Sequence, residues 1–101
     1  MRITTHVAGM VARVALHGRF EFSANHEFKS CTRLVLQSKE VREIEIDMAD
    51  VNYIDSSALG MLLVLREGAD AAFKKISLLN CRGVIKQVLD MANFSKLFTI
   101  K

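Results

Sequence analysis

The stretch that decides the fold is Tyr53-Ile54-Asp55-Ser56-Ser57-Ala58-Leu59-Gly60-Met61-Leu62-Leu63. Apolar residues lead into a step of three short hydrogen-bonding side chains, and an almost wholly apolar run follows it. Asp and Ser are preferred at the start of a helix because their oxygen atoms accept hydrogen bonds from the free N–H groups of the first turn. The Asp55-Ser56-Ser57 step therefore predicts the start of a helix. Taken alone, it requires no more of Ser56 than a capping role.

This helix is predicted to run from Ser56 to about Phe73. Its first half carries apolar side chains all round, namely Ala58, Leu59, Met61, Leu62, Leu63, Val64 and Leu65. Only its second half has a clear polar face, so the first half should be largely buried. Gly68 lies inside it at a cost of about 1 kcal/mol relative to Ala, and close packing is one explanation.

Strands are predicted before and after this helix in the sequence. Glu43-Ile44-Glu45-Ile46-Asp47-Met48 alternates strictly between polar and apolar residues, so this strand should bury one face and expose the other. Residues 3–7 and 10–16 are typical of a hairpin that turns at Ala8-Gly9 and ends at His17-Gly18. Residues 76–79 and 97–100 complete the predicted strands.

Two further helices are expected. Ser23 can cap the first, whose apolar positions recur at helical spacing: Phe28, Cys31, Leu34 and Val35. Asn80 can cap the second, which presents Val84, Ile85, Val88, Leu89 and Ala92. Strands separated by helices need crossover connections, so the fold class is α/β with a mixed, largely parallel sheet. The alternation at residues 43–48 predicts that the helices pack on one face only.

Composition restricts the function. The 101 residues form one domain, 1–101, and half of them are apolar. The net charge is +3, but the basic residues are scattered and no aromatic residues interleave them, which argues against nucleic acid as a partner. No apolar run approaches the roughly 18–20 residues of a membrane span, and no signal-peptide pattern is present, so we expect a cytoplasmic protein that does not enter a membrane.

Metal, redox and catalytic roles find little support. His6, His17 and His26 share no ligand spacing. Cys31 and Cys81 stand far apart, and free buried thiols are favoured over a disulfide. The surroundings of Ser56 lack the glycines of a nucleophile elbow, and no phosphate-cradling glycine loop occurs. We therefore expect neither an enzyme nor a cofactor.

The whole chain resembles the STAS family, which is named from sulfate transporters and anti-sigma factor antagonists. The resemblance covers residues 1–101 in element order. It is most specific over Ile46-Asp47-Met48-Ala49-Asp50-Val51 and Tyr53-Ile54-Asp55-Ser56-Ser57-Ala58-Leu59-Gly60. The subgroup it looks like is the free-standing anti-sigma factor antagonist of bacterial partner switching.

This resemblance implies a phosphorylation-controlled regulator of transcription. In such proteins an anti-sigma factor serine kinase phosphorylates the serine directly after the Asp, which is Ser56 here. A metal-dependent serine phosphatase, often fused to or controlled by a response regulator, reverses the reaction. The predicted partner surface comprises the residues flanking Ser56 and two strand-to-helix junctions: Asp55, Ser57, Gly60, Asn52, Tyr53, Glu21, Ser23 and Asn25.

Three departures from the family pattern stand out. Ala58 replaces a common Gly, which favours the helix. Glu21 stands where relatives often carry Asp, and the C-terminal helix of many relatives has no counterpart after the last strand. A second reading also stays open: a STAS subunit that docks on the ATPase of a lipid-transporting ABC complex without being phosphorylated. The complete Asp55-Ser56-Ser57 step favours the switch.

Overall fold

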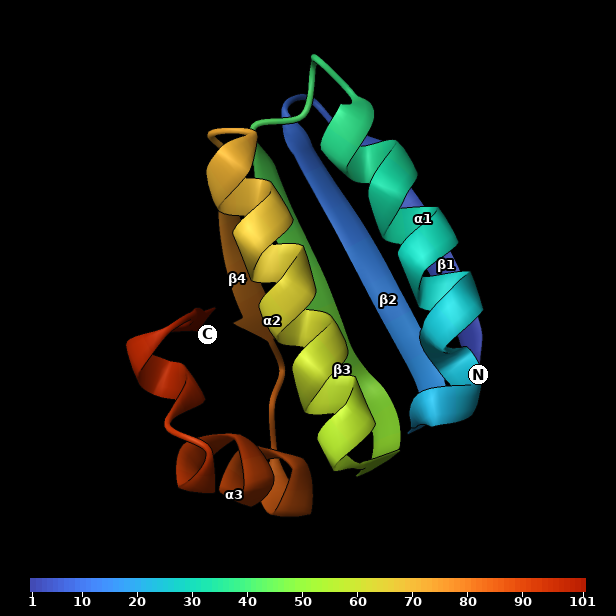
Figure 1. Ribbon diagram of the computed structural model, residues 1–101, viewed down its shortest axis with the longest axis vertical. Coiled ribbons are helices and arrows are strands. Elements are labelled where there is room, and N and C mark those ends of the chain that lie inside the picture. Colours follow the sequence, from blue (N-terminus) through green and yellow to red (C-terminus); the bar gives the residue numbers. More distant parts are fainter.

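A five-stranded sheet carries the fold, as a computed structural model covering residues 1–101 shows (Figure 1). The strands lie in the order β1-β2-β3-β4-β5. Their bounds are β1 Arg2–Ala8, β2 Val11–Phe20, β3 Glu43–Ile54, β4 Lys75–Leu79 and β5 Thr99–Ile100. β1 pairs with β2 in the antiparallel sense, and every other neighbouring pair is parallel. The predicted α/β class with a largely parallel sheet is confirmed.

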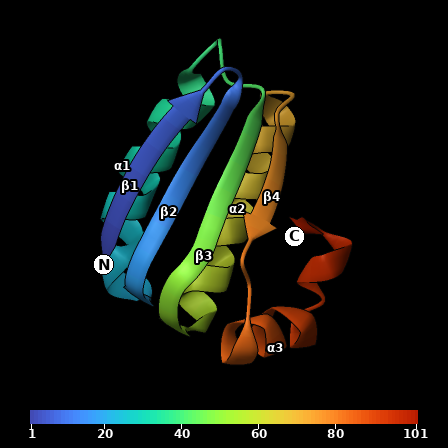
Figure 2. The same ribbon diagram turned by 180° about the vertical axis from the view of Figure 1, so that it is seen from behind.

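Two long helices cover one face of this sheet. They are α1 (Asn25–Gln37) and α2 (Ser56–Ala71), and they lie in front of the strands in Figure 1. Seen from behind, the opposite face of the sheet is bare (Figure 2). A third helix, α3 (Gly83–Met91), lies beyond the end of β4 rather than on the bare face. The helices therefore leave one face open, as the alternation in β3 predicts.

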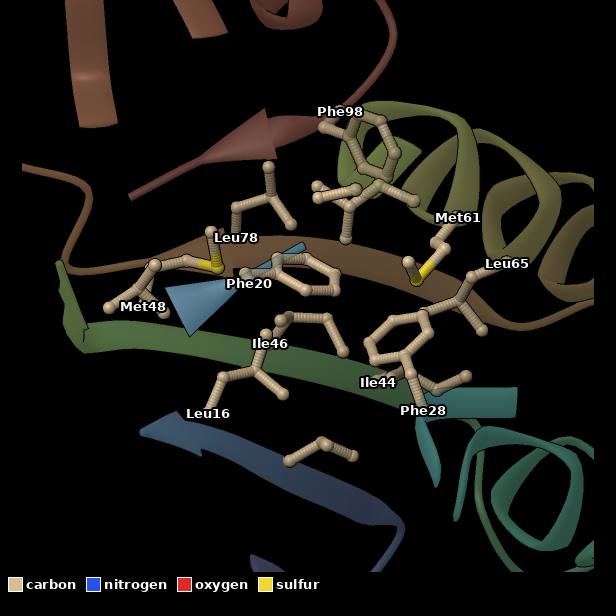
Figure 3. Packing of buried hydrophobic residues seen from close by; sticks show 14 of the residues in the cluster. Leu16, Phe20, Phe28, Ile44, Ile46, Met48, Met61, Leu65, Leu78 and Phe98 are labelled. Atoms are coloured by element: carbon tan, nitrogen blue, oxygen red, sulfur yellow. The ribbon is translucent and has the colours of Figure 1, made fainter. Parts of the chain in front are cut away.

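The core lies between the sheet and the two long helices. Ile44, Ile46 and Met48 of β3 are fully buried, whereas Glu43, Glu45 and Asp47 between them are only half-buried. Figure 3 shows side chains from the strands pointing toward side chains of the helices, among them Leu16, Ile46, Leu78, Phe28, Met61 and Leu65. Burial of such side chains contributes about 1.5–3 kcal/mol each.

Two strands continue further than predicted. β2 does not end at His17-Gly18 but runs on to Phe20, with register shifts against β3 between Ala15 and His17 and between Gly18 and Arg19. Gly18 accommodates the bulge because it adopts φ 104°. β3 does not end at Met48 but continues to Ile54, the residue before Asp55.

The predicted N-caps of the first and last helices, Ser23 and Asn80, are wrong. Ser23 lies in a 3-10 turn (Phe22–Ala24), and Ala24 is the residue that precedes α1 without a side-chain cap. Asn80 adopts a left-handed conformation with φ 58°, and its amide donates to Asp47 Oδ1 at 3.0 Å instead of capping α3. The Ser23 hydroxyl instead donates to the nearby carboxylate of Glu21, and Asn80 is engaged by a strand that is remote in sequence.

Two apolar positions also differ from expectation. Leu34 and Val84 match the helical period but are 71% and 70% exposed. On α1, the polar residue Thr32 is buried instead of Leu34, and its hydroxyl is satisfied by donating to the carbonyl of Phe28 at 2.8 Å.

Close packing explains the glycine inside α2. A Cβ at Gly68 would lie 2.9 Å from Cδ1 of Leu36, so the two helices meet at this point. The expected link between Gly68 and tight packing is confirmed.

Candidate phosphorylation and partner-binding site

Asp55 starts α2. It has extended backbone angles, and its Oδ1 accepts a hydrogen bond from the amide of Ala58 at 2.9 Å. Asp55 is therefore the N-cap, and Ser56 is the first helical residue. The hydroxyl of Ser56 takes no part in this cap and lies at an exposed position, whereas Ser57 is half-buried.

This position suits a phosphate acceptor. The first N–H groups of a helix have no carbonyl partner one turn earlier, so the amides at Ser56 and Ser57 can bind an anion. The positive end of the helix dipole favours negative charge at the same place. The start of α2 therefore offers free donors and a favourable dipole for a negatively charged group.

The pairing of β2 with β3 brings a second segment to this helix start. Phe20 stands opposite Ile54 in the register, and the amide of Asp55 donates to the carbonyl of Phe20 at 3.3 Å. The segment after Phe20 therefore lies beside the first turn of α2. This contact joins the two strand-to-helix junctions that the sequence predicts as one surface.

A small charged network rigidifies this edge. The guanidinium of Arg19 lies 3.9 Å from the centre of the Tyr53 ring and forms an ion pair with Glu21 at 3.1 Å. Ser23 donates its hydroxyl to the other oxygen of Glu21 at 3.4 Å. Arg19 thus connects Tyr53 to Glu21, and Glu21 in turn holds Ser23; no motif in the sequence indicates this role of Arg19.

A hollow of about 310 Å³ separates the starts of α1 and α2. Among the predicted site residues, Asn25, Ser57 and Gly60 line it. Phe22 also lines it and is 69% exposed. The sequence holds a signal for the exposure of Phe22. This residue follows Phe20 by two positions, but the strand ends between them, so no neighbouring element covers the Phe22 ring.

Asn52 stands somewhat apart. With Tyr53 it belongs to the end of β3, and its side chain is exposed. It makes no side-chain contact with the Arg19 network among the hydrogen bonds of the protein.

No three His, Cys, Asp or Glu side chains gather into a group that could hold a metal ion. None of the helices has both the length and the apolar character needed to span a bilayer.

Comparison with known proteins gives the family. The family model described as "Mlab, STAS domain" matches residues 3–99. A STAS-domain containing protein of Pseudomonas aeruginosa (strain UCBPP-PA14) is 37% identical over 92 residues, which are 91% of this chain and 89% of that protein. The chain belongs to the STAS-domain family.

Solved structures share the fold at low identity. The anti-sigma factor antagonist SpoIIAA in its unphosphorylated form superposes with a TM-score of 0.77 at 16% identity, covering 99% of this chain and 87% of SpoIIAA. The phosphorylated form of the Bacillus protein gives 0.76 at 16% identity, covering 99% and 91%. The STAS domain of a SulP transporter from Vibrio cholerae gives 0.74 at 19% identity, covering 95% and 77%. The same fold thus occurs in anti-sigma factor antagonists and in transporter domains.

Proposed function

We propose that this protein is a phosphorylation-controlled anti-sigma factor antagonist whose acceptor is Ser56. The observation that carries the proposal is the division of labour at the start of α2. Asp55 caps the helix, and Ser56 beside it stays exposed. Modification of Ser56 therefore need not break a structural contact. SpoIIAA, which has the same fold, is described in both an unphosphorylated and a phosphorylated form.

Unphosphorylated protein binds the anti-sigma factor kinase and releases the client that the kinase was holding. Phosphorylated protein lets go, and a metal-dependent serine phosphatase restores it. In this cycle the chain is a substrate and a competitor, not a catalyst.

The energetics are sufficient for a switch. A phosphate adds a charge of about −1.5 to −2, which the helix start accommodates within the protein itself. A partner surface shaped for a neutral hydroxyl would have to bury that charge poorly paired, at a cost of roughly 2–5 kcal/mol. At about 1.4 kcal/mol per factor of ten, affinity falls by roughly 30-fold to a few thousand-fold.

The test begins with affinity capture from the source organism. Ser56→Ala serves as the bait and Ser56→Asp as the matched control, and mass spectrometry identifies the proteins retained only by the first. The captured kinase is then incubated with wild-type protein and ATP, and the modified residue is mapped. We expect modification at Ser56, and none in Ser56→Ala.

Other outcomes point elsewhere. Modification confined to Ser57 would move the acceptor by one residue. A transporter ATPase retained equally by both baits, with no modification of either serine, would replace the switch with the subunit of a lipid-transporting complex.

A further inference from the structure

A continuous groove runs between α1 and α2, away from the bare face of the sheet. The hollow beside Ser57 is one half of it. The other half, of about 320 Å³, is lined by Phe28, Thr32, Arg33, Leu36 and Leu65. Lys29, Met61 and Val64 line both halves, so the two hollows adjoin. We call this surface the α1–α2 groove.

The groove is closed at one end and open at the other. The two helices run in the same direction, because each connects neighbouring parallel strands (Figure 1). They meet at Leu36 and Gly68, where a Cβ on the glycine would lie only 2.9 Å from the leucine. The open end lies at their N-termini, where Phe22, Ser57 and Gly60 form the lining.

The lining is apolar with positive charge at its edge. Val64 is 57% exposed and Phe22 is 69% exposed, so both present apolar surface at the groove. Lys29 and Arg33 of α1 are the charged residues of the lining, and no Asp or Glu contributes to either half. The N-terminal ends of two helices add partial positive charge at the open end.

We propose that the α1–α2 groove binds an acidic amphipathic helix of the partner kinase. An apolar helix face would lie over Val64, Met61 and Phe22, as in other helix-in-groove complexes. Acidic side chains beside that face would meet Lys29 and Arg33. α1 has 13 residues, so at about 1.5 Å per residue it spans about 20 Å and offers room for three to four turns of a partner helix.

The identity of the partner rests on the proposed function, which the groove deepens. Ser57 and Gly60 belong both to the groove and to the site around Ser56. A phosphate on Ser56 would therefore stand at the open end of a surface that attracts acidic side chains. Repulsion between the phosphate and the bound helix explains why the modified protein lets its partner go.

The test uses the full unphosphorylated chain, labelled with ¹⁵N, and two stapled helical peptides of 14 residues. One peptide carries Leu on one face and Glu beside it; in the other every Glu is replaced by Lys. We expect the acidic peptide to shift the amides of the groove residues and to bind at least tenfold more tightly than the basic one. Lys29→Glu combined with Arg33→Glu should weaken it at least tenfold, and Lys39→Glu outside the groove should not.

A second pair of variants tests the apolar lining. Val64→Gln should weaken the acidic peptide at least fivefold. Leu34→Gln, which changes an exposed leucine on the same layer of helices but outside the groove, should leave binding unchanged.

Four results would overturn the proposal: no shifts up to millimolar acidic peptide, equal binding of the basic peptide, groove amides that respond to phosphatidylglycerol vesicles instead, or groove amides that respond to the protein's own concentration. The last two would assign the groove to a membrane surface or to a second copy. No kinase or ATP enters this test. If the peptide does not bind but the kinase modifies Ser56, the proposed role of the groove is wrong and the switch stands. If the peptide binds but Ser56 is not modified, the switch is wrong and the groove stands.

Discussion

Asp55 and Ser56 are neighbours with separate tasks. The carboxylate of Asp55 holds the first turn of α2 by accepting from Ala58, so the adjacent hydroxyl is left exposed on a rigid element. Under the proposed function this separation matters, because a change at the Ser56 hydroxyl leaves the Asp55 cap intact.

We expect the stability cost to follow this division. Asp55→Ala should lower the free energy of unfolding by about 1 kcal/mol, the usual cost of losing an N-cap. Ser56→Ala should change it by less than about 0.5 kcal/mol, as for an exposed substitution away from structural contacts. Urea denaturation followed by circular dichroism measures both. A larger loss in Ser56→Ala than in Asp55→Ala would make Ser56 a structural residue.

The two cysteines should differ in reactivity. Burial raises the pKa of the Cys81 thiol to about 11, and the negative charges of Asp47 and Asp90 act in the same direction against the opposing charge of Lys86. Cys31 is only half-buried. Because the thiolate is the reactive form, iodoacetamide at pH 8 should alkylate Cys31 well before Cys81 in the folded protein. Mass spectrometry of the labelled peptides checks this, and equal rates in denaturant provide the control. Faster labelling of Cys81 would contradict the packing around it.

At the scale of elements, two polar side chains tie together segments that are remote in sequence. The amide of Asn80, just after β4, donates to Asp47 of β3. The ammonium of Lys74, just before β4, is buried and donates to the carbonyls of Ser38 and Val41 at 2.7 and 2.6 Å. These contacts hold the end of β4 against β3 and its start against the connection between α1 and β3.

The Asp47 contact should make stability sensitive to acid. Burial alone would raise the pKa of Asp47, but hydrogen bonds from Asn80 and from the amide of Ala49, with the charges of Arg13 and His17, lower the pKa below 3.8. A carboxyl whose pKa is lower in the folded state stabilises the protein above its unfolded pKa, and this contribution disappears as the pH falls through the folded pKa. Asn80→Gly removes the amide while still allowing a left-handed backbone. In this variant an NMR titration should show the pKa of Asp47 raised toward 3.8, and the decline of stability below about pH 4 should be shallower. An unchanged pKa would mean that Asn80 has no part in it.

Lys74 should matter for stability despite its charge. In Lys74→Met the stem is retained, but two carbonyls lose their donor, and each buried group left unsatisfied costs on the order of 1–3 kcal/mol. We expect a loss of that size in urea denaturation. Lys75→Met is the matched control, because Lys75 is the exposed next residue. Equal effects of the two substitutions would show that the contacts of Lys74 contribute nothing specific.

At the scale of the whole molecule, the hydrophobic periodicity of the sequence predicted those features that depend on which face of an element is buried. β3 alternates because one of its faces meets helices and the other meets solvent. Most apolar residues in the first half of α2 are buried because they face the sheet, whereas Val64 is 57% exposed. Leu34 and Val84 misled the prediction because helical spacing does not say how wide a face the neighbouring elements cover. Asn80 was misassigned because its partner Asp47 lies 33 residues away.

The candidate site also has features that the local sequence predicts and features that depend on the packed structure. Local chemistry predicts the Asp55-Ser56-Ser57 helix start. The nearness of Glu21 to that start depends on the β2–β3 register, including two shifts that no pattern in the sequence announces. The α1–α2 groove depends on how two helices diverge from the contact at Gly68, so it too required the packed structure.

A surface assembled from both junctions should respond to charge reversal at Glu21. Glu21→Lys breaks an ion pair with Arg19 that is partly exposed, so the free energy of unfolding should fall by no more than about 1 kcal/mol. The same change releases the side chains of Arg19 and Ser23 from Glu21 and so disorganises the junction after β2, and we expect kinase affinity to fall at least tenfold in titration calorimetry. Glu40→Lys is the matched control, because the loop that carries Glu40 lies at the opposite end of α2 from Ser56 (Figure 1). Loss of affinity in Glu21→Lys alone would support an interface at the two junctions. Wild-type affinity in both variants would move the interface away from the end of β2.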